Sequence, residues 1–472
     1  MYRVKRPVLW LYSTLAWAAQ PLLRRKLRRR AQAEPGYAQH VPERFGHYDS
    51  APRVPQPGEP PLVWIHAVSL GETRAAAILL TALRARWPGV RVLLTHGTAT
   101  GRAEGAKLLQ PGDLQAWLPW DTPGAVQRFV CHFRPQLGLL METEVWPNLV
   151  AGCQQRGIPL VLANARLNDA SLRKAQRLGW LARPAYRGLT AVWAQTEADA
   201  QRLRALGAPV QGVFGNLKFD VEPDGAQLAQ GRAWRAAHAQ PVVLLASTRE
   251  GEEALWLQAL QTLESHEPLN KEPKTALSLT QQAQAAIKKQ AWQAVQWLLV
   301  PRHPQRFDEV AQQLQSAGLS VARRSQWADG PASQADVWLG DSLGEMPLYY
   351  ALADVALLGG SFAPLGGQNL IEAAACACPV VLGPHTFNFA QAAEDACASG
   401  AAQRVADMAQ AVRAALAWVH DEAALAQARQ QAQQFAQAHQ GAAQAMVEAM
   451  AQWLDGGFED KKRLKPLQGK RE

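Results

Sequence analysis

The sequence lacks the cysteines of a disulfide framework. Its 472 residues include five cysteines, an odd number without framework spacing, which favours a reducing compartment. Cys376 and Cys378 stand one residue apart in an alanine-rich stretch, and no second pair of metal ligands accompanies them. We therefore expect ordinary buried thiols and no metal site. The cysteines are Cys131, Cys153, Cys376, Cys378 and Cys397.

Most of the chain also lacks an excess of positive charge, although its formal net charge is +9. The first thirty residues contain nine arginines and lysines and no acid, which equals the whole excess. The remaining chain is therefore neutral, and this disfavours a nucleic-acid-binding face, which has to neutralise phosphates. The basic character belongs to an N-terminal arm.

Between its two basic clusters the arm contains an apolar segment, residues 7–23. This segment of about 17 residues is at the lower limit for spanning a bilayer as a helix, and Trp10, Tyr12 and Trp17 favour the membrane interface. We expect residues 1–30 to form a membrane-anchor helix that either spans the bilayer or lies in its interface. The alternatives are a cleaved signal peptide, which the following arginines disfavour, and an amphipathic helix packed on the protein itself.

From Pro61 onward, short apolar segments alternate with longer helical ones, which is typical of a parallel sheet covered by helices. Two such series predict two doubly wound α/β domains whose strand-end loops carry the chemistry. The first series of expected strands is 62–66, 90–94, 137–140, 159–162 and 191–194. The second is 242–245, 297–300, 336–339, 354–358 and 379–382.

The expected domain limits follow from these two series. We place an N-terminal domain at residues 31–225 and a C-terminal domain at residues 226–455. Residues 264–291 are rich in lysine and glutamine and are expected to be a polar surface insertion. Residues 402–453 are rich in alanine and glutamine and are expected to be helical, followed by a mobile tail at residues 456–472.

The most informative loop of the second half is glycine-rich and covers residues 359–369, just before a predicted helix. Glycine lets the backbone approach a ligand closely, and a helix N-terminus favours an anion such as phosphate. Glu372, in the first turn, could accept hydrogen bonds from ribose hydroxyls, or it could simply complement the helix dipole. Neighbouring strand-end loops contribute Arg249, Arg302 and Gly344, and this coincidence predicts a nucleotide site.

Acids follow the strands of the first half. Glu72 stands at the start of a predicted helix, where it could remove a proton from a sugar-accepting hydroxyl, although a helix-capping acid is the commoner role. Glu142 and Glu144 follow another strand, and we expect them to point in opposite directions. At most one of them should then face the cleft. Lys218 adds a cation for an acidic ligand.

Taken together, these segments resemble the transferases of 3-deoxy-D-manno-octulosonic acid (Kdo). The resemblance runs in order from the N-terminal arm to about residue 390. The matching stretches are HAVSLGET (66–73), LPWD (118–121), METEVWPN (141–148), ANARL (163–167), GNLKFD (215–220), VPRHP (300–304), GDSLGE (340–345) and GPHTFNF (383–389).

The resemblance implies a glycosyltransferase-B fold, with two Rossmann-like domains facing a cleft. It implies an inverting transfer of Kdo from CMP-Kdo to the 6'-hydroxyl of the tetraacylated lipid A precursor, lipid IVA, in lipopolysaccharide biosynthesis. No metal or other cofactor is implied. A lipid acceptor also implies a catalytic body on the cytoplasmic side of the inner membrane.

The resemblance further implies roles for individual residues. Glu72 falls on the proton acceptor, and Glu142 and Lys218 fall on groups that stabilise the transition state. The implied donor-binding residues are Arg249, Pro301, Arg302, His303, Leu343, Gly344, Glu345, Asn369, Leu370, Ile371 and Glu372. The departures from the family pattern are Gln368 for histidine, Leu370-Ile371 for Pro-Leu, Arg249 for histidine and Ser342 for threonine.

Two other functions remain open at this point. One is a UDP-sugar transferase or a sugar-nucleotide epimerase of the same fold, which would prefer UDP to CMP. The other is a non-catalytic, membrane-tethered scaffold that binds a sugar nucleotide without turnover.

Overall fold

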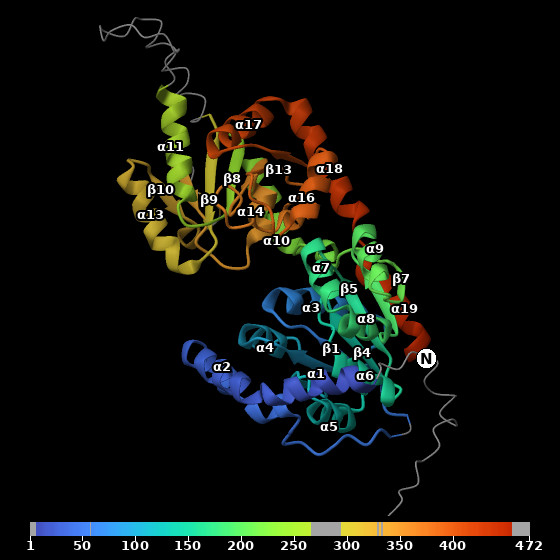
Figure 1. The fold of residues 1–472 in the computed structure, drawn as a ribbon. Coiled ribbons are helices and arrows are strands. Elements are labelled where there is room, and N and C mark those ends of the chain that lie inside the picture. The colour runs from blue at the N-terminus through green and yellow to red at the C-terminus, as the bar shows by residue number, and fades with distance from the viewer. Residues whose placement is uncertain (1–5, 57, 266–293, 328–329, 332–333, 456–472) are drawn as a thin grey trace, which may run out of the picture. The chain divides into compact units, whose positions relative to one another are not determined.

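The computed structural model describes residues 6–56, 58–265, 294–327, 330–331 and 334–455 (Figure 1). They form two compact units. The first extends to Asp220 and includes the C-terminal helix α19 (Ala442–Leu454), and the second is Val221–His439. Helix α19 therefore belongs with the first unit, whereas the expected domain limits assign it to the second. Most of the expected insertion, residues 266–291, and the expected tail lie outside the described residues.

The first unit contains a parallel sheet in the order β3-β2-β1-β4-β5-β6-β7. Its strands are β1 (Leu62–His66), β2 (Arg91–His96), β3 (Leu114–Trp117), β4 (Leu137–Met141), β5 (Leu160–Ala165), β6 (Ala191–Ala194) and β7 (Val210–Val213). Its helices between the strands are α3 (Leu70–Arg86), α4 (Ala99–Ala106), α5 (Pro123–Phe133), α6 (Pro147–Gln155), α7 (Asp169–Arg177), α8 (Gly179–Arg187) and α9 (Glu197–Ala205).

Helices cover both faces of this sheet, so its central strands are buried on two sides. Every residue of β1 is buried. Leu62 and Trp64 pack in one core with α5 and α6, while Val63 and Ile65 pack in the other with α3 and α19. This alternation follows from the two-residue period of a strand. It explains why the strand is apolar throughout.

The second unit repeats this plan with a parallel sheet in the order β10-β11-β9-β8-β12-β13-β14. Its strands are β8 (Val242–Thr248), β9 (Gln296–Pro301), β10 (Val321–Arg323), β11 (Val337–Leu339), β12 (Val355–Leu358), β13 (Val380–Leu382) and β14 (Ala402–Arg404). Its helices are α10 (Gly225–Ala237), α11 (Glu252–Ser265), α13 (Phe307–Ser316), α14 (Met346–Leu352), α15 (Leu370–Ala375), α16 (Ala390–Ala398), α17 (Met408–His420) and α18 (Glu422–Ala438).

These two sheets confirm the prediction of two doubly wound parallel α/β domains. In each sheet successive strands are first added towards one edge and then towards the other. This change in strand order falls between β1 and β4 in the first sheet and between β8 and β12 in the second. Loops diverge at such a reversal, and ligands of doubly wound sheets bind there, outside the carboxyl ends of the strands. Both reversals therefore mark the places where a site is expected.

Four short strands, β3, β7, β10 and β14, were not among those expected. They form the edges of the two sheets and have mixed burial rather than a continuous apolar pattern. An edge strand pairs on one side only and keeps polar side chains, so its sequence resembles a loop. The expectation of helix throughout residues 402–453 is wrong at its start, because β14 occupies Ala402–Arg404.

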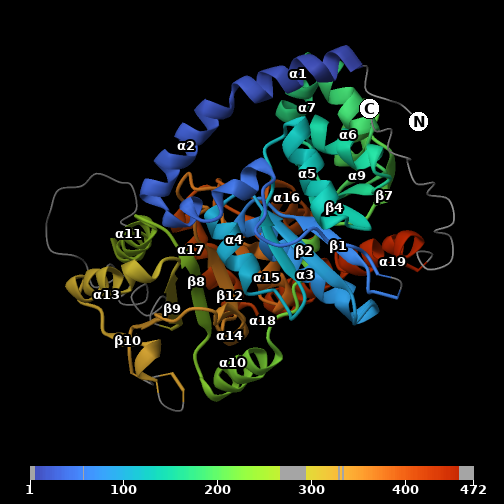
Figure 2. The ribbon, with the colours of Figure 1, turned by 90° about the horizontal axis from the view of Figure 1, so that it is seen from below.

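The basic arm forms helices α1 (Arg6–Ala18) and α2 (Gln20–Ala33), and α1 contacts α6 and α8 of the first unit (Figures 1 and 2). Ser13 donates a hydrogen bond to the Oδ1 atom of Asn148 at 2.9 Å, and Leu27 is buried against Tyr37 and Trp117. The arm therefore packs on the protein. Within the described residues, no helix has both the length and the apolar character needed to cross a membrane.

The arm also exposes large apolar side chains, most of them on α1. The exposed large apolar side chains of α1 and α2 are Trp10, Leu11, Leu15, Trp17 and Leu22.

Candidate functional site

Glu72 lies in the first turn of α3, where it takes part in a capping box. The backbone N–H of Val68 donates to Glu72 Oε2 at 2.7 Å, and the Ser69 hydroxyl donates to Oε1 at 3.2 Å. In return, the Glu72 backbone N–H donates to Ser69 Oγ at 3.3 Å. These reciprocal bonds satisfy N–H groups that a helix start leaves open. The carboxylate thus caps the helix, and the same carboxylate would have to act as the base if Glu72 has that role.

The surroundings of Glu72 make it unlike an ordinary capping acid. The pKa of its carboxyl group is raised to about 7. Burial is the main cause, the charges of Glu142 and Glu144 add to it, and the Val68 N–H opposes the shift. A carboxyl group with a pKa near neutrality can both take up and release a proton under working conditions. The electrostatics therefore allow Glu72 to act as a general base.

Glu142 and Glu144 are both close enough to raise the pKa of Glu72, although each has its own partner. The expected opposite directions do not follow from their two-residue spacing, which puts side chains on one side of an extended segment. The chain leaves β4 in a turn rather than an extended segment, and Glu142 has a left-handed φ of 60°. Glu142 is buried and pairs with Arg166, with Oε2 and Nε 3.0 Å apart. Glu144 accepts a hydrogen bond from the Trp146 indole at 2.7 Å, and burial raises its pKa.

Lys218 lies in the short helix η3 (Leu217–Asp220), which two side chains hold at the first unit. Asn164, in β5, accepts a hydrogen bond from the Leu217 N–H at 3.1 Å and has a φ of 51°. Asp220 accepts the N–H of Gly441 at 2.6 Å and also that of Ala443, and so joins η3 to the start of α19. The half-buried Lys218 is thus next to Leu217, whose N–H is bound at the carboxyl end of β5.

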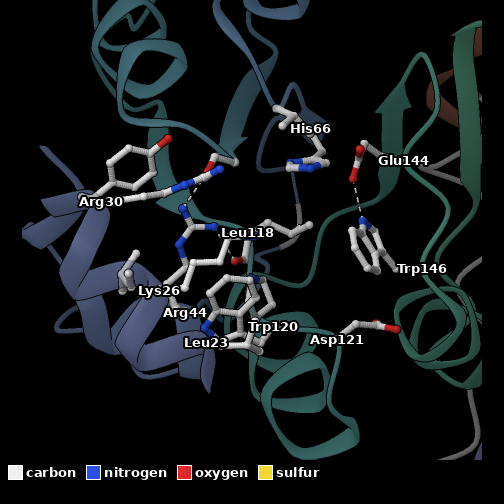
Figure 3. Close-up of a pocket in the computed structure, with 15 residues that line it drawn as sticks. Leu23, Lys26, Arg30, Arg44, His66, Leu118, Trp120, Asp121, Glu144 and Trp146 are labelled. Atoms are coloured by element: carbon white, nitrogen blue, oxygen red, sulfur yellow. Dashed lines mark hydrogen bonds between the residues drawn. The ribbon is translucent and has the colours of Figure 1, made fainter. Parts of the chain in front are cut away.

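A pocket of about 260 Å³ is lined by residues of the loop that precedes α3 and by helix α2 (Figure 3). Val68 of this loop lines the pocket and also donates its backbone N–H to Glu72, which places the pocket beside Glu72. Helix α2 forms one side, and Glu144 with Trp146 forms the other. The lining combines basic, aromatic and apolar side chains. It comprises Leu23, Lys26, Leu27, Arg30, Tyr37, Arg44, His66, Val68, Gly97, Leu118, Pro119, Trp120, Asp121, Glu144 and Trp146.

Arg44 lines this pocket and is held in place by contacts with two tryptophans and a backbone carbonyl. Its guanidinium lies 4.0 Å from the ring centroid of Trp117 and 5.4 Å from that of Trp120, which are cation–π distances. It also donates to the Gly97 carbonyl at 2.9 Å, and burial lowers its pKa to about 10. Sequence reasoning missed this pocket, although Lys26 and Arg30 at a four-residue spacing signal one basic helix face.

In the second unit, two adjacent buried acids hold the strand-end loops. The Glu252 carboxylate at the start of α11 accepts four backbone N–H groups, those of Arg249, Gly360, Phe362 and Ala363, at 2.7–3.3 Å. Burial nevertheless raises its pKa, and these N–H groups oppose the shift. The glycine-rich loop after β12 is therefore attached to the loop after β8, and sequence reasoning did not single out Glu252.

The neighbouring acid, Glu253, pairs with Arg306. Arg306 donates to the two carboxylate oxygens at 3.0 and 2.8 Å, and both side chains are buried. Thr248 also donates its hydroxyl to Glu253 at 2.5 Å. Because Arg302 donates its backbone N–H to the Thr248 carbonyl at 2.9 Å, the ends of β8 and β9 are held together.

The expected donor-binding residues follow four strands that are neighbours in the second sheet, in the order β11-β9-β8-β12. Arg249 follows β8, Pro301 to His303 end β9, Leu343 to Glu345 follow β11, and Asn369 to Glu372 follow β12. Since parallel strands end at one edge, the structure brings these segments to the same edge of one sheet.

Their side chains differ in what they offer to a ligand. Leu343 is 69% exposed and Gly344 has a φ of 80°, whereas Leu370 and Ile371 are buried, so only their backbone could meet a donor. Asn369 caps α15 by accepting the Ile371 N–H at 3.2 Å.

Two acids of this set have other neighbours. Glu345 accepts from Arg324 at 2.9 Å and from the Ser342 hydroxyl. Glu372 is half-buried and lies close enough to raise the pKa of the buried Tyr350, behind the dominant effect of burial. In the part of the chain that the structure describes, no three His, Cys, Asp or Glu side chains are grouped so that they could hold a metal ion.

Comparison with known proteins gives a consistent result. Residues 39–221 match a family model described as 3-deoxy-D-manno-octulosonic-acid transferase. A 3-deoxy-D-manno-octulosonic acid transferase of Bordetella pertussis is 49% identical over 414 residues, which is 86% of this chain and 90% of that protein.

Among solved structures, the fold is similar to that of a glycosyltransferase from Rickettsia africae ESF-5, with a TM-score of 0.51 and 11% identity over 84% of this chain and 99% of that chain. It is also similar to a UDP-GlcNAc 2-epimerase from Neisseria meningitidis bound to UDP-GlcNAc, with a TM-score of 0.52 and 15% identity over 83% and 100% of the two chains. At these identities the two structures support the fold alone.

Replacing Glu252 with glutamine should loosen the glycine-rich loop of the second unit. The amide offers one oxygen instead of two to four N–H donors and turns its own N–H₂ towards some of them, which costs about 2 kcal/mol or more. We expect a lower midpoint of thermal unfolding by calorimetry. Glu250→Gln is the matched control, because Glu250 is 57% exposed beside the same loop. Equal midpoints for the two variants would contradict the anchoring role.

Proposed function

The chain belongs to the 3-deoxy-D-manno-octulosonic acid (Kdo) transferase family and is a glycosyltransferase, and from this premise we propose its reaction. It transfers Kdo from CMP-Kdo to the 6'-hydroxyl of the tetraacylated lipid A precursor in lipopolysaccharide biosynthesis, with inversion and without a metal or other cofactor. The observation that carries the proposal is Glu72, a carboxyl with a pKa of about 7 beside a basic and apolar pocket.

Glu72 acts as the general base in the proposed reaction. Its carboxylate takes the proton of the acceptor 6'-hydroxyl, and the oxygen forms a bond to the anomeric carbon of Kdo. The bond from that carbon to the CMP phosphate oxygen breaks, so CMP leaves with the bonding electrons. Lys218 offsets negative charge that develops in the transition state. Glu142, which follows β4, also stabilises the transition state.

The pocket beside Glu72 is proposed to hold the acceptor. A phosphorylated, acylated sugar needs cations for its phosphate and apolar surface for its chains. Lys26, Arg30 and Arg44 supply the cations, and Leu23 and Leu27 on the same side supply apolar surface. The pocket also borders α2, so a lipid reaching it lies along the arm.

The donor is proposed to bind at the carboxyl edge of the second sheet. Arg249 and Arg302 can pair with its phosphate. Asn369 and the acid Glu372 stand at the start of α15, where ribose hydroxyls can be bound. The backbone around Gly344 is open, because no atom lies within 4 Å of a Cβ built there.

We propose that the protein works at the cytoplasmic face of the inner membrane, with its arm in the interface. The exposed face of α1 carries Trp10 and Trp17, which are 70% and 69% exposed. Tryptophan favours the head-group layer, and the arginines of α2 can bind anionic lipids. This placement supports access to a membrane-bound acceptor.

The reaction is tested by mass spectrometry of the lipid A precursor after incubation with CMP-Kdo generated in the same reaction. We expect a mass gain of one or more Kdo units, and a rate at least about 100-fold lower for Glu72→Gln, because glutamine keeps the capping box but accepts no proton. Thr196→Ala is the control: it removes the N-cap of α9, costs about 1 kcal/mol of stability and leaves Glu72 and its hydrogen bonds unchanged.

Two outcomes would contradict this assignment. A nearly active Glu72→Gln would exclude Glu72 as the base. No mass gain from the folded protein, combined with tighter binding of UDP than CMP, would favour a UDP-sugar transferase or epimerase, and CMP-Kdo binding without turnover would favour a scaffold.

The pH dependence should report the ionisation of Glu72. The base must be deprotonated, so kcat/KM should fall about tenfold per pH unit below a midpoint near pH 7. Glu144→Gln removes a negative charge that raises the Glu72 pKa, so the midpoint should move to lower pH. Glu197→Gln is the control, because Glu197 is exposed on α9 and pairs with Arg204. An identical midpoint in Glu144→Gln would argue against Glu72 as the titrating group.

The acceptor pocket predicts a selective effect of Arg30. Replacing Arg30 with glutamine removes a cation from the pocket, which should raise the KM for the acceptor on the order of tenfold through loss of a charge-assisted hydrogen bond. The KM for CMP-Kdo should stay the same. Arg74→Gln serves as the control, since Arg74 is exposed and pairs with Glu104. A change in donor KM instead of acceptor KM would refute the assignment.

A further inference from the structure

Helices α7 (Asp169–Arg177) and α8 (Gly179–Arg187) form a hairpin in the first unit with an unusual charge. From Asp169 to Arg187 the sequence contains five basic residues and one acid, Asp169, which pairs with Arg202 of α9. No residue of α7 is buried. Four of the basic side chains, all exposed, make no ion pair with any residue that the structure describes: Arg173, Lys174, Arg177 and Arg183.

The junction of the two helices is apolar and exposed. Leu178 is 52% exposed and Trp180 is 47% exposed. Two large apolar side chains at the turn, surrounded by unpaired cations, leave both kinds of group in contact with water. Such a combination suits a surface that is apolar below and anionic at its boundary, as a lipid bilayer is.

The hairpin continues a surface that starts at the arm. Helix α8 contacts both α1 and α7, so it lies between the arm and the first helix of the hairpin (Figure 1). Helix α1 exposes Trp10, Leu11, Leu15 and Trp17. Exposed apolar side chains of the arm and of the hairpin therefore occur on neighbouring elements that are far apart in the sequence.

We propose that the α7–α8 hairpin is a second membrane-binding element, in which Leu178 and Trp180 enter the head-group layer of an anionic bilayer. Arg173, Lys174, Arg177 and Arg183 bind the lipid phosphates around them. The proposal rests on the proposed function in one respect, namely that the acceptor is a membrane lipid.

A second attachment has a consequence that the arm alone cannot provide. One helix in the interface leaves the protein free to rotate about that helix. Two attached elements restrict this rotation and raise each other's effective concentration at the surface. The hairpin would thus hold the first unit in one orientation, with the pocket lined by α2 kept beside the lipid from which the acceptor comes.

The test is cosedimentation of the full-length protein with sucrose-loaded vesicles. Vesicles of phosphatidylglycerol and phosphatidylethanolamine provide the anionic surface, and phosphatidylcholine vesicles the neutral one. Arg173→Gln/Lys174→Gln/Arg177→Gln should weaken binding to the anionic vesicles on the order of tenfold or more and reduce its salt dependence. Leu178→Ser/Trp180→Ser should weaken binding to both kinds of vesicle.

Matched controls separate this effect from a general change in surface character. Val213→Ser removes an apolar side chain that is 46% exposed on β7 of the same unit, and Arg232→Gln/Arg413→Gln removes exposed charges from the second unit. Both controls should bind vesicles as the unchanged protein does. Vesicle binding by the hairpin variants equal to that of the unchanged protein would overturn the proposal, as would an equal loss in the controls.

A second measurement keeps the inference distinct from the proposed reaction. Transfer to an acceptor dispersed in detergent should be unchanged in the hairpin variants, whose unfolding midpoints are measured in parallel. Loss of that transfer with normal unfolding would place the hairpin in substrate binding and overturn the membrane role. Absence of transfer by every protein, with the vesicle effect intact, would refute the proposed reaction and leave the hairpin as a membrane-binding element.

Discussion

Parallel strand direction is the constraint on which the rest of this structure depends. Every strand in each sheet ends at the same edge, so the loops that follow the strands gather there however far apart they are in the sequence. At the reversals between β1 and β4 and between β8 and β12, neighbouring loops diverge and leave room for a ligand. Glu72 and Glu142 follow the first pair of strands, while Glu252 and Gly360 follow the second. Both units thus place an acid after one of the two strands that flank the change in strand order: Glu72 after β1 and Glu252 after β8.

Backbone strain occurs at these same strand ends. Glu142, Asn164 and Ser247 have φ values between 51° and 60°, a left-handed conformation that costs a residue other than glycine on the order of 1–3 kcal/mol. Glu142 directly follows β4, Asn164 lies in β5, and Ser247 lies in β8 at a shift in its register with β9. Such strain persists only where the surroundings hold it, and Asn164 shows how, because its side chain accepts the Leu217 N–H. Left-handed residues other than glycine therefore stand at strand ends in both units.

The sequence was sufficient where burial on two faces dictates composition, as in β1 and β8, and insufficient where it does not, as at the edge strands β7 and β14. Residues at strand ends, such as Arg249 and Gly344, could be predicted because the fold class alone brings them to one edge. The pocket could not, because Arg30, Arg44 and Trp120 meet only when α2 packs on the first unit. The turn after β4 could not be predicted either, because it depends on a left-handed φ at Glu142, which is uncommon for a residue other than glycine.

Glu72 shows that an acid in a capping box need not have the low pKa of an exposed cap. A cap exposed to water gains from the helix dipole, which favours the charged form and keeps the carboxyl acidic. Here burial and the acids Glu142 and Glu144 act in the other direction, and the Val68 N–H only partly opposes them. The hydrogen bonds of the capping box hold the carboxylate in one orientation, and they do not return its pKa to the usual low value. In the proposed reaction, substrate binding that displaces the Val68 N–H from Oε2 would raise the basicity of Glu72 when the proton has to be removed, because this hydrogen bond lowers its pKa.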